Sequence, residues 1–124
     1  MKLYQAWLDP GVSAQFMTAC EGQPAQRVEI GPRIGGKFLI EMPTPGGPVL
    51  HSGEFLELVP GKKIVFTWNS RHVNPGTHVV LTFDEVDGRT KVTLTHVKFA
   101  TEAIRDNHVR GWTVILDNYV GAMA

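Results

Sequence analysis

Residues 78–96 read HVVLTFDEVDGRTKVTLTH, and this stretch decides the fold. Apolar residues alternate on both sides of an Asp87-Gly88 step, and they are Val79, Leu81 and Phe83 before it and Val92 and Leu94 after it. A period of two puts alternate side chains on one face of a strand. An Asp-Gly step tolerates the positive φ angles of a two-residue hairpin. The stretch therefore predicts two antiparallel neighbouring strands joined by a tight turn.

Four further segments upstream are typical of strands, because they are rich in branched and aromatic residues and are bounded by glycine and proline. They are residues 25–30, 36–42, 49–59 and 63–68. In the last of them, Ile64, Phe66 and Trp68 share one face. Short connectors between successive strands favour an antiparallel meander.

Two regions have a helical period instead. Asp9-Pro10 is a helix-start signal, which predicts a short helix through about Met17. Beyond Thr101, apolar and aromatic residues recur every three or four positions, at Ile104, His108, Trp112, Leu116, Tyr119 and Met123. This stripe predicts a terminal helix of about six turns. A helix and a sheet must bury their apolar faces on each other, so we expect a two-layer α+β domain with a hollow between the layers.

Gly111 interrupts the predicted terminal helix one residue before Trp112. Glycine weakens a helix interior by about 1 kcal/mol relative to alanine. We expect a close packing contact with another backbone to explain it, with room for a ligand as the alternative.

The composition excludes several classes of protein. The 124 residues are 43% hydrophobic and 19% charged, with 12 basic and 12 acidic side chains. The chain is too apolar for disorder and lacks the basic excess that supports non-specific nucleic-acid binding. It contains no twenty-residue apolar stretch for a membrane span, and a single cysteine, Cys20, excludes an intrachain disulfide. We expect one domain over residues 1–124, located in the cytoplasm, with no nucleic-acid partner.

Five histidines, at positions 51, 72, 78, 96 and 108, lie on five separate predicted segments. None has the spacing of a metal site, so no metal or other cofactor is predicted. No serine, cysteine or lysine occupies a known catalytic signature, so no catalytic residue is predicted either. His72 falls in a connector and is expected in solvent. His96 and His108 continue inward faces, either as hydrogen-bonded buried imidazoles or as polar groups that orient a ligand in an apolar cavity.

Trp7, Trp68 and Trp112 come from the first segment, the middle of the sheet and the terminal helix. All three are expected in the core. If the core is partly hollow, the same indoles become walls of an apolar pocket.

Several segments together resemble a known family. They are residues 4–10 (YQAWLDP), 35–38 (GGKF) with Met42, 53–60 (GEFLELVP), 64–68 (IVFTW), 93–96 (TLTH), and His108 followed by Gly111, Trp112 and Leu116. In this order they make the chain similar to the activator of heat shock protein 90 ATPase homologues, in the START-like or birch-pollen-allergen-like (SRPBCC) superfamily. The resemblance implies a helix-grip fold, in which a curved antiparallel sheet holds a long C-terminal helix over a hydrophobic cavity.

The chain departs from that family at two places. Only three residues precede Tyr4, where relatives carry a strand, so the first strand is expected to be missing. A sheet that lacks a member exposes backbone donors and acceptors that favour pairing with another chain, which predicts a homodimer or an incorrectly assigned start. Residues 16–19 (FMTA) replace a bulkier stretch of many relatives, and a smaller, more flexible gate to the cavity is expected there.

The leading functional hypothesis is non-catalytic binding of a small hydrophobic or amphipathic molecule between the sheet and the terminal helix. The residues expected to line this site are Phe38, Met42, Phe55, Phe66, Trp68, His96, His108 and Trp112. One alternative is an interaction module that docks on a chaperone or another protein, as the eukaryotic namesakes of the family do. The other is an enzyme of the cyclase or hydratase type, with His96 or His108 as general acid or base.

Overall fold

The computed structural model describes residues 2–18, 25, 27–43, 47–70, 77–97 and 102–123. In chain order the elements are α1 (Lys2–Gln5), α2 (Pro10–Phe16), β1 (Arg27–Ile30), β2 (Lys37–Met42), β3 (Val49–Val59), β4 (Lys63–Thr67), β5 (His78–Val86), β6 (Arg89–Val97) and α3 (Glu102–Met123). Every predicted helix and strand is confirmed, with bounds that shift by at most a few residues. The short helix α1 was not predicted.

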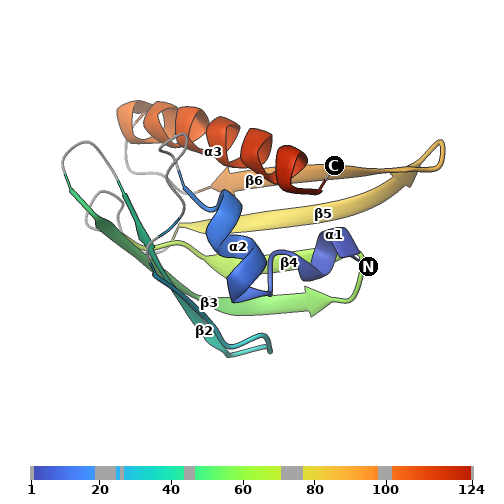
Figure 1. The fold of residues 1–124 in the computed structure, drawn as a ribbon, viewed down its shortest axis with the longest axis horizontal. Helices are drawn as coiled ribbons and strands as arrows, with labels where there is room; N and C mark the ends of the chain where they lie inside the picture. Colours follow the sequence, from blue (N-terminus) through green and yellow to red (C-terminus); the bar gives the residue numbers. More distant parts are fainter. Residues whose placement is uncertain are drawn as a thin grey trace.

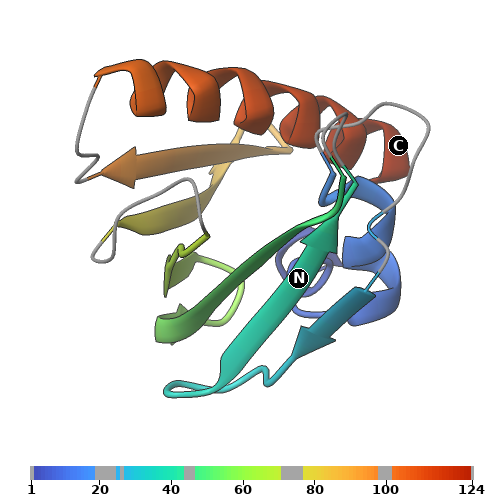
Figure 2. The same cartoon turned by 90° about the vertical axis from the view of Figure 1, so that its left-hand side faces the viewer.

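The strands form an antiparallel meander in the order β1-β2-β3-β4-β5-β6. Figures 1 and 2 show that the sheet is curved and that α2 and α3 lie on its concave side. The two-layer α+β architecture expected from the sequence is therefore confirmed. The described residues contain no strand ahead of β1, because the segment before α2 forms the helix α1.

The turn between β5 and β6 has the predicted form. Asp87 and Gly88 have φ angles of 50° and 76°, and Val86 pairs with Arg89 across the turn. Positive φ at both central residues is the geometry of a type I′ turn, whose twist matches that of the flanking strands. This turn sets the register of β6, so Val92 lies opposite Phe83 and Leu94 lies opposite Leu81.

Helix α2 begins where the sequence predicts. The Asp9 carboxylate accepts hydrogen bonds from the backbone N–H groups of Gly11 at 2.9 Å and Val12 at 3.1 Å. These bonds satisfy donors that have no partner within the helix, and Pro10 occupies a position where no donor is needed. Phe16 and Met17, at the other end of α2, are buried in the core. Residue 19 of this segment lies outside the described residues, and the flexible gate stays a prediction.

The core lies between the helices and the concave face of the sheet, and it contains Trp7, Trp68 and Trp112 as predicted. On α3 the fully buried stripe is Trp112, Ile115 and Tyr119, while Leu116 packs only at its edge. The stripe is rotated slightly from the predicted one, since the sequence pattern favoured Leu116 over Ile115. Both choices satisfy the helical period, and only the position of the sheet distinguishes them.

Gly111 does not make the contact that the sequence suggested. Among the described residues outside its own helix, none has an atom within 4 Å of a Cβ built on Gly111, so no second backbone of this part of the chain approaches it. The expectation of a close packing contact is wrong, and the residue faces open space.

Replacing Gly111 with alanine is therefore expected to stabilise the protein by about 0.5–1 kcal/mol. Alanine restricts the unfolded chain and meets no steric conflict in the folded helix. Urea denaturation followed by far-UV circular dichroism measures the change. A destabilised variant would show that something outside the described residues occupies the space beside Gly111.

Candidate functional site

The bend in β3 positions the centre of the concave face. Phe38 of β2 lies opposite Gly53 of β3, and the ring of Phe38 covers the position where a side chain would be. A Cβ atom on Gly53 would lie 2.6 Å from the Phe38 ring and 1.9 Å from the backbone oxygen of Thr67. Glycine is thus required here, because β3 passes from pairing with β2 to pairing with β4 at this point.

An aromatic cluster builds on Phe38. Its ring centroid lies 5.5 Å from that of Phe55, 5.2 Å from that of Phe66 and 6.0 Å from that of Trp68. The Trp68 ring lies 4.8 Å from that of Trp112 on α3. These separations are typical of favourable ring packing. The five aromatic residues that the sequence analysis proposed for the site therefore form one continuous series of ring contacts from β2 to α3.

Two of the predicted site residues, His96 and His108, lie at the α3 end of this series of ring contacts. The indole N–H of Trp112 donates to His96 Nδ1 at 3.0 Å, and the His96 and His108 rings are 5.3 Å apart. An imidazole nitrogen that accepts a hydrogen bond carries no proton. Neutral His96 therefore has its proton on Nε2, and Trp112 fixes the direction in which this donor points.

The pKa of His96 is lowered to about 3, first by burial and then by the neighbouring His108 and His78, which disfavour a second positive charge. At neutral pH only about one molecule in ten thousand then carries a charged His96. A group this weakly basic is poorly matched to general acid–base catalysis near pH 7, where the effective pKa lies close to the working pH. The site favours His96 as a neutral hydrogen-bonding group.

His96 also predicts a pH dependence of stability. Its pKa is lower in the folded chain than the ordinary value of 6.5, so the unfolded chain binds more protons between about pH 3 and pH 6.5. The contribution of His96 to stability is therefore complete above pH 6.5 and is lost progressively as the pH falls toward 3.

The matched variant is His96→Asn, because the asparagine side-chain oxygen can take the place of Nδ1 as acceptor for Trp112 without titrating. We expect the free energy of unfolding of the unmodified chain to fall more steeply than that of the variant between pH 7 and pH 4, as measured by urea denaturation. Parallel curves for the two proteins would contradict the lowered pKa.

The structure adds His51 to this region, which the sequence analysis did not select. The ring of His51 lies 4.8 Å from that of Trp68. Its alternation with Val49 and Phe55 along β3 was a signal that it faces inward. Met42, by contrast, is buried at the far end of β2, opposite Val49. His72 lies outside the described residues.

The space that the described residues enclose between the sheet and α2 is small. The described residues surround a cavity of about 20 Å³, lined by Trp7, Ser13, Met17, Ile30, Phe38, Ile40, Phe55, Phe66 and Trp68. Such a volume holds about one water molecule. This cavity is therefore much smaller than an organic guest requires. Of the predicted lining residues, Phe38, Phe55, Phe66 and Trp68 line it and the other four do not.

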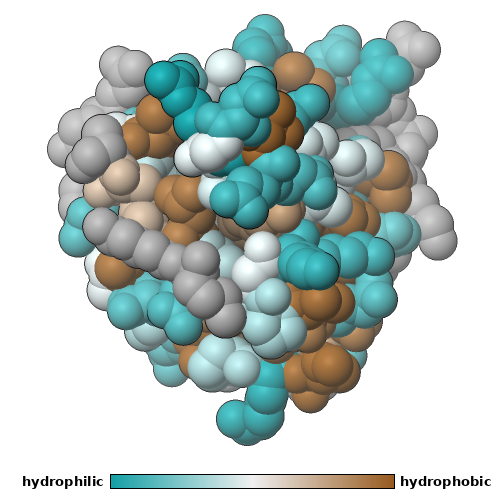
Figure 3. All heavy atoms as spheres, turned by 90° about the vertical axis from the view of Figure 1, so that its right-hand side faces the viewer, coloured by the Kyte–Doolittle hydropathy of each residue, from teal (hydrophilic) through white to brown (hydrophobic). Residues whose placement is uncertain are grey.

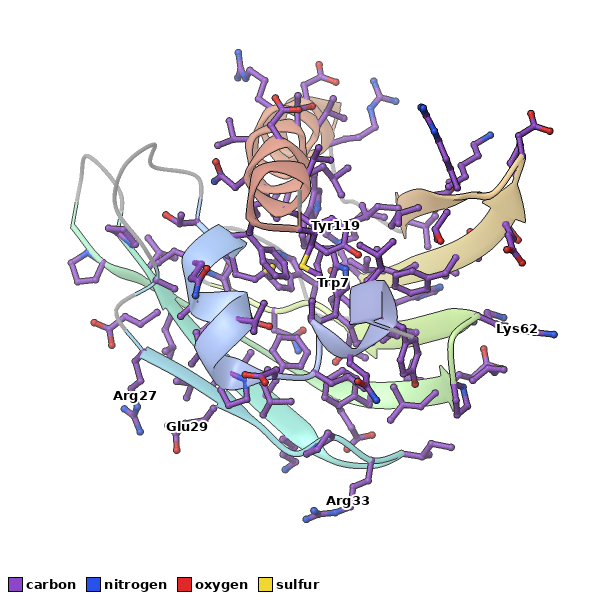
Figure 4. The ribbon with its side chains drawn as sticks, turned by 45° about the vertical axis from the view of Figure 1, so that its right-hand side comes forward. Trp7, Arg27, Glu29, Arg33, Lys62 and Tyr119 are labelled. Atoms are coloured by element: carbon purple, nitrogen blue, oxygen red, sulfur yellow. The ribbon has the colours of Figure 1, made fainter. Side chains whose placement is uncertain are left out.

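The cavity nevertheless has polar groups in its wall. The indole nitrogen of Trp68 is buried and has no hydrogen-bond partner among the described residues, whereas that of Trp7 interacts with the Tyr119 hydroxyl. The Ser13 hydroxyl, also in the wall, donates to the backbone oxygen of Ala6 at 2.8 Å. Figure 4 shows Trp7 beside Tyr119 beneath α3, and burial raises the pKa of Tyr119 to about 12. A buried N–H donor in an apolar wall, here the Trp68 indole, favours a guest with a hydrogen-bond acceptor.

A second hollow lies on the outer side of the sheet, where β2, β3 and β4 bend. It has a volume of about 510 Å³, and charged or polar residues predominate in its wall, including Glu29, Lys37, Ser52, Glu54 and Asn69. No pattern in the sequence indicated this hollow, because it forms where β3 bends at Gly53. Its open shape is unlike the apolar enclosure of a typical small-molecule site.

The described residues hold no group of three or more histidine, cysteine, aspartate or glutamate side chains that is close enough for a metal ion. None of the helices in this part of the chain is both long and apolar enough to cross a membrane.

A curved antiparallel sheet that closes on a long C-terminal helix, with an aromatic cluster between them, defines the helix-grip class of the SRPBCC superfamily. A family model described as Activator of Hsp90 ATPase homolog 1-like protein matches residues 1–123. The chain belongs to this family, as the sequence resemblance predicted.

Solved structures agree. Protein CV1439 from Chromobacterium violaceum is similar at 24% identity and a TM-score of 0.80, over 97% of this chain and 85% of that one. The AHSA1-like protein from Aeromonas hydrophila is similar at 21% identity and a TM-score of 0.78, over 97% and 81%. An HSP90 activator from Plasmodium falciparum is similar at 27% identity and a TM-score of 0.67, over 90% and 78%. No curated protein matches the chain.

Proposed function

We propose that this protein binds a small, mostly apolar molecule with one hydrogen-bond acceptor between the sheet and the N-terminal half of α3. The walls of the site are Phe38, Phe55, Phe66, Trp68 and Trp112. The observation that carries the proposal is the pairing of apolar walls with a buried N–H donor, the Trp68 indole, which has no hydrogen-bond partner among the described residues. The neighbouring His96 ring is oriented by the hydrogen bond that Trp112 donates to it. Apolar walls with a few placed polar groups are the general composition of small-molecule sites.

The guest enters by displacing side chains, since the present cavity is only about 20 Å³. Among the described residues, α3 packs against α2, and Trp112 on α3 contacts Trp68 of the sheet through their rings. Asn118 donates to the Thr18 backbone oxygen at 3.1 Å, and the Tyr119 hydroxyl donates to that of Leu3 at 2.8 Å. These bonds hold the C-terminal half of α3, so the half that carries Trp112 is the one we expect to lift.

The role assigned to His96 is orientation and not proton transfer. Its ring accepts the Trp112 N–H and so fixes the position of this indole in the wall, and its lowered pKa keeps a positive charge out of the apolar site. The preferred ligand is therefore neutral or amphipathic, with its acceptor near α3 and its apolar part against the phenylalanines of the sheet. We place this activity in the cytoplasm, the location expected for a chain with a single cysteine.

The test is a fluorescence titration with the hydrophobic probe 1-anilinonaphthalene-8-sulfonate. Trp112→Ala is expected to weaken probe binding at least tenfold, because it removes a wall and releases the His96 ring. Val109→Ala is the matched control, since Val109 lies on the same helix and is exposed. Far-UV circular dichroism establishes that both variants are folded. Equal probe affinity in folded Trp112→Ala and in the control would refute the proposed site.

A second candidate function is docking on a protein partner through the outer hollow, where Lys37 and Glu54 lie on paired strands. A protein-docking function is consistent with the description of the Plasmodium falciparum relative as an HSP90 activator. The test is the ATPase rate of a purified Hsp90 chaperone with and without the chain. Stimulation that is lost in Lys37→Glu but retained in Trp112→Ala would favour docking over ligand binding.

A further inference from the structure

We infer that the outer edge of β6, together with the adjacent side of α3, is the interface of a homodimer in which two copies of β6 pair antiparallel about a two-fold axis. This interface lies away from the proposed ligand site and does not depend on it.

The first observation is the edge itself. β6 is the last strand of the sheet, and no other described strand pairs with its outer side. The Val86–Arg89 pair that flanks the tight turn is hydrogen bonded, and such pairs alternate along an antiparallel ladder. The backbone groups of Thr90, Val92 and Leu94 therefore point away from β5. A nine-residue edge of this kind is a template for another strand.

The second observation is an apolar face that is only half covered. Leu81 and Phe83 on β5 are buried, but Leu94 and Val92, directly opposite them on β6, are only partly buried. Burial of this apolar face therefore decreases from β5 to β6, at the edge of the sheet. An additional strand beside β6 would complete the cover over both residues.

The third observation is the neighbouring side of α3. A groove of about 370 Å³ runs between β6 and the helix, lined by Leu3, Thr90, Val92, Leu116, Tyr119, Val120 and Met123. Val120 is 67% exposed, and Val109, on the same side of the helix by its spacing, is 57% exposed. Figure 3, which faces the end of the molecule with the β5–β6 turn and the C-terminus, shows hydrophobic side chains at the surface between hydrophilic ones. The partner must therefore cover a strand edge and a helix side together.

A second copy of this chain meets both requirements. If Thr93 lies on the two-fold axis, it pairs with its own symmetry mate, and Val92 of one copy pairs with Leu94 of the other. The outward backbone groups of Val92 and Leu94 then exchange hydrogen bonds, and their side chains share the face that carries the helices. The same symmetry brings the exposed apolar side of one α3 toward that of the other, as an isologous interface requires.

The charges of β6 are compatible with this register. Arg89 and Lys91 are its charged residues, and both lie in its first half. In the two-fold pairing they lie opposite Val97 and Thr95 of the other copy, so no like charges are directly opposed. A parallel pairing in register would instead place each basic residue beside its mate.

Size-exclusion chromatography with light scattering is the first test, and it should give twice the 13.7 kDa mass of the chain in the low micromolar range. Thr93→Lys places two ammonium groups at the two-fold axis and is expected to weaken the dimer at least tenfold. Gln15→Lys, on the exposed side of α2, makes the same change in charge and should leave the dimer intact. A monomeric unmodified chain would overturn the inference, and so would equal dimer affinity in the two variants.

Disulfide trapping tests the register independently. In a Cys20→Ser background, Thr93→Cys should cross-link under mild oxidation, because a residue and its mate in a non-hydrogen-bonded pair have Cα atoms about 4.5 Å apart. Thr95→Cys is the control. It lies on the same face, but its mate is about 14 Å away along the strands, beyond the reach of a disulfide. Equal cross-linking at positions 93 and 95, or none at 93, would refute this pairing.

Discussion

Replacing Gly53 with alanine is expected to lower the free energy of unfolding by about 3 kcal/mol or more, because a Cβ atom has no space at this position. It would lie 1.9 Å from the backbone oxygen of Thr67 and 2.6 Å from two atoms of the Phe38 ring. The ring could rotate away, but the Thr67 carbonyl belongs to β4 and is held by the sheet. Relief of the contact therefore requires β3 and β4 to separate.

The same region contains a hydrogen bond that depends on this close approach. The backbone N–H of Glu54 donates to the Thr67 hydroxyl at 2.9 Å. Separation of the strands at Gly53 breaks this bond as well, so the backbone and side-chain losses occur together. Urea denaturation of Gly53→Ala measures the change. Gly111→Ala is the matched control, because it adds the same methyl group where no neighbour lies within 4 Å. Similar stability changes in the two variants would show that the bend does not require glycine.

The second large effect is expected from Trp68→Ala, at about 3–5 kcal/mol of lost stability. Trp68 is only 2% exposed and its ring contacts those of Phe38, His51, Phe66 and Trp112. Removal of the indole leaves a void between the sheet and α3, and the surrounding rings cannot all move to fill it.

Trp68→Phe distinguishes packing from hydrogen bonding at this position. The indole N–H has no partner among the described residues, so phenylalanine loses no hydrogen bond with them and retains most of the ring contacts. We expect a loss below about 1.5 kcal/mol. Thermal and urea denaturation of both variants provide the comparison. If Trp68→Phe destabilises the protein as much as Trp68→Ala, the indole N–H has a stabilising partner that this conformation does not contain.

Trp68 also connects the stability of the core with the proposed ligand site. The same indole that fills the core in the closed conformation presents its N–H to the cavity wall. A ligand with an acceptor would compensate for the buried donor while replacing part of the packing. Ligand binding is therefore expected to raise the thermal midpoint of the unmodified chain more than that of Trp68→Phe, provided that the ligand acceptor contacts this N–H.

Much of the fold followed from local pattern. The alternation on either side of Asp87-Gly88 predicted the antiparallel β5–β6 hairpin, and Asp9-Pro10 predicted the start of α2. The family also followed from the order of short motifs along the chain, and the match over residues 1–123 confirmed it. The site residues were selected by facing alone, which brought five aromatic residues into contact but also included Met42 at the far end of β2.

What the sequence determined by itself was the type and order of the elements, because hydrophobic period, capping and turn chemistry act within a few neighbouring residues. Only the tertiary structure decided how much space remains inside, which nitrogen of His96 carries the proton, and why Gly53 permits no side chain while Gly111 faces open space. Those properties depend on distances of a few ångströms between residues that are far apart in the chain. Such distances are set when all the elements pack together, and no local pattern contains them.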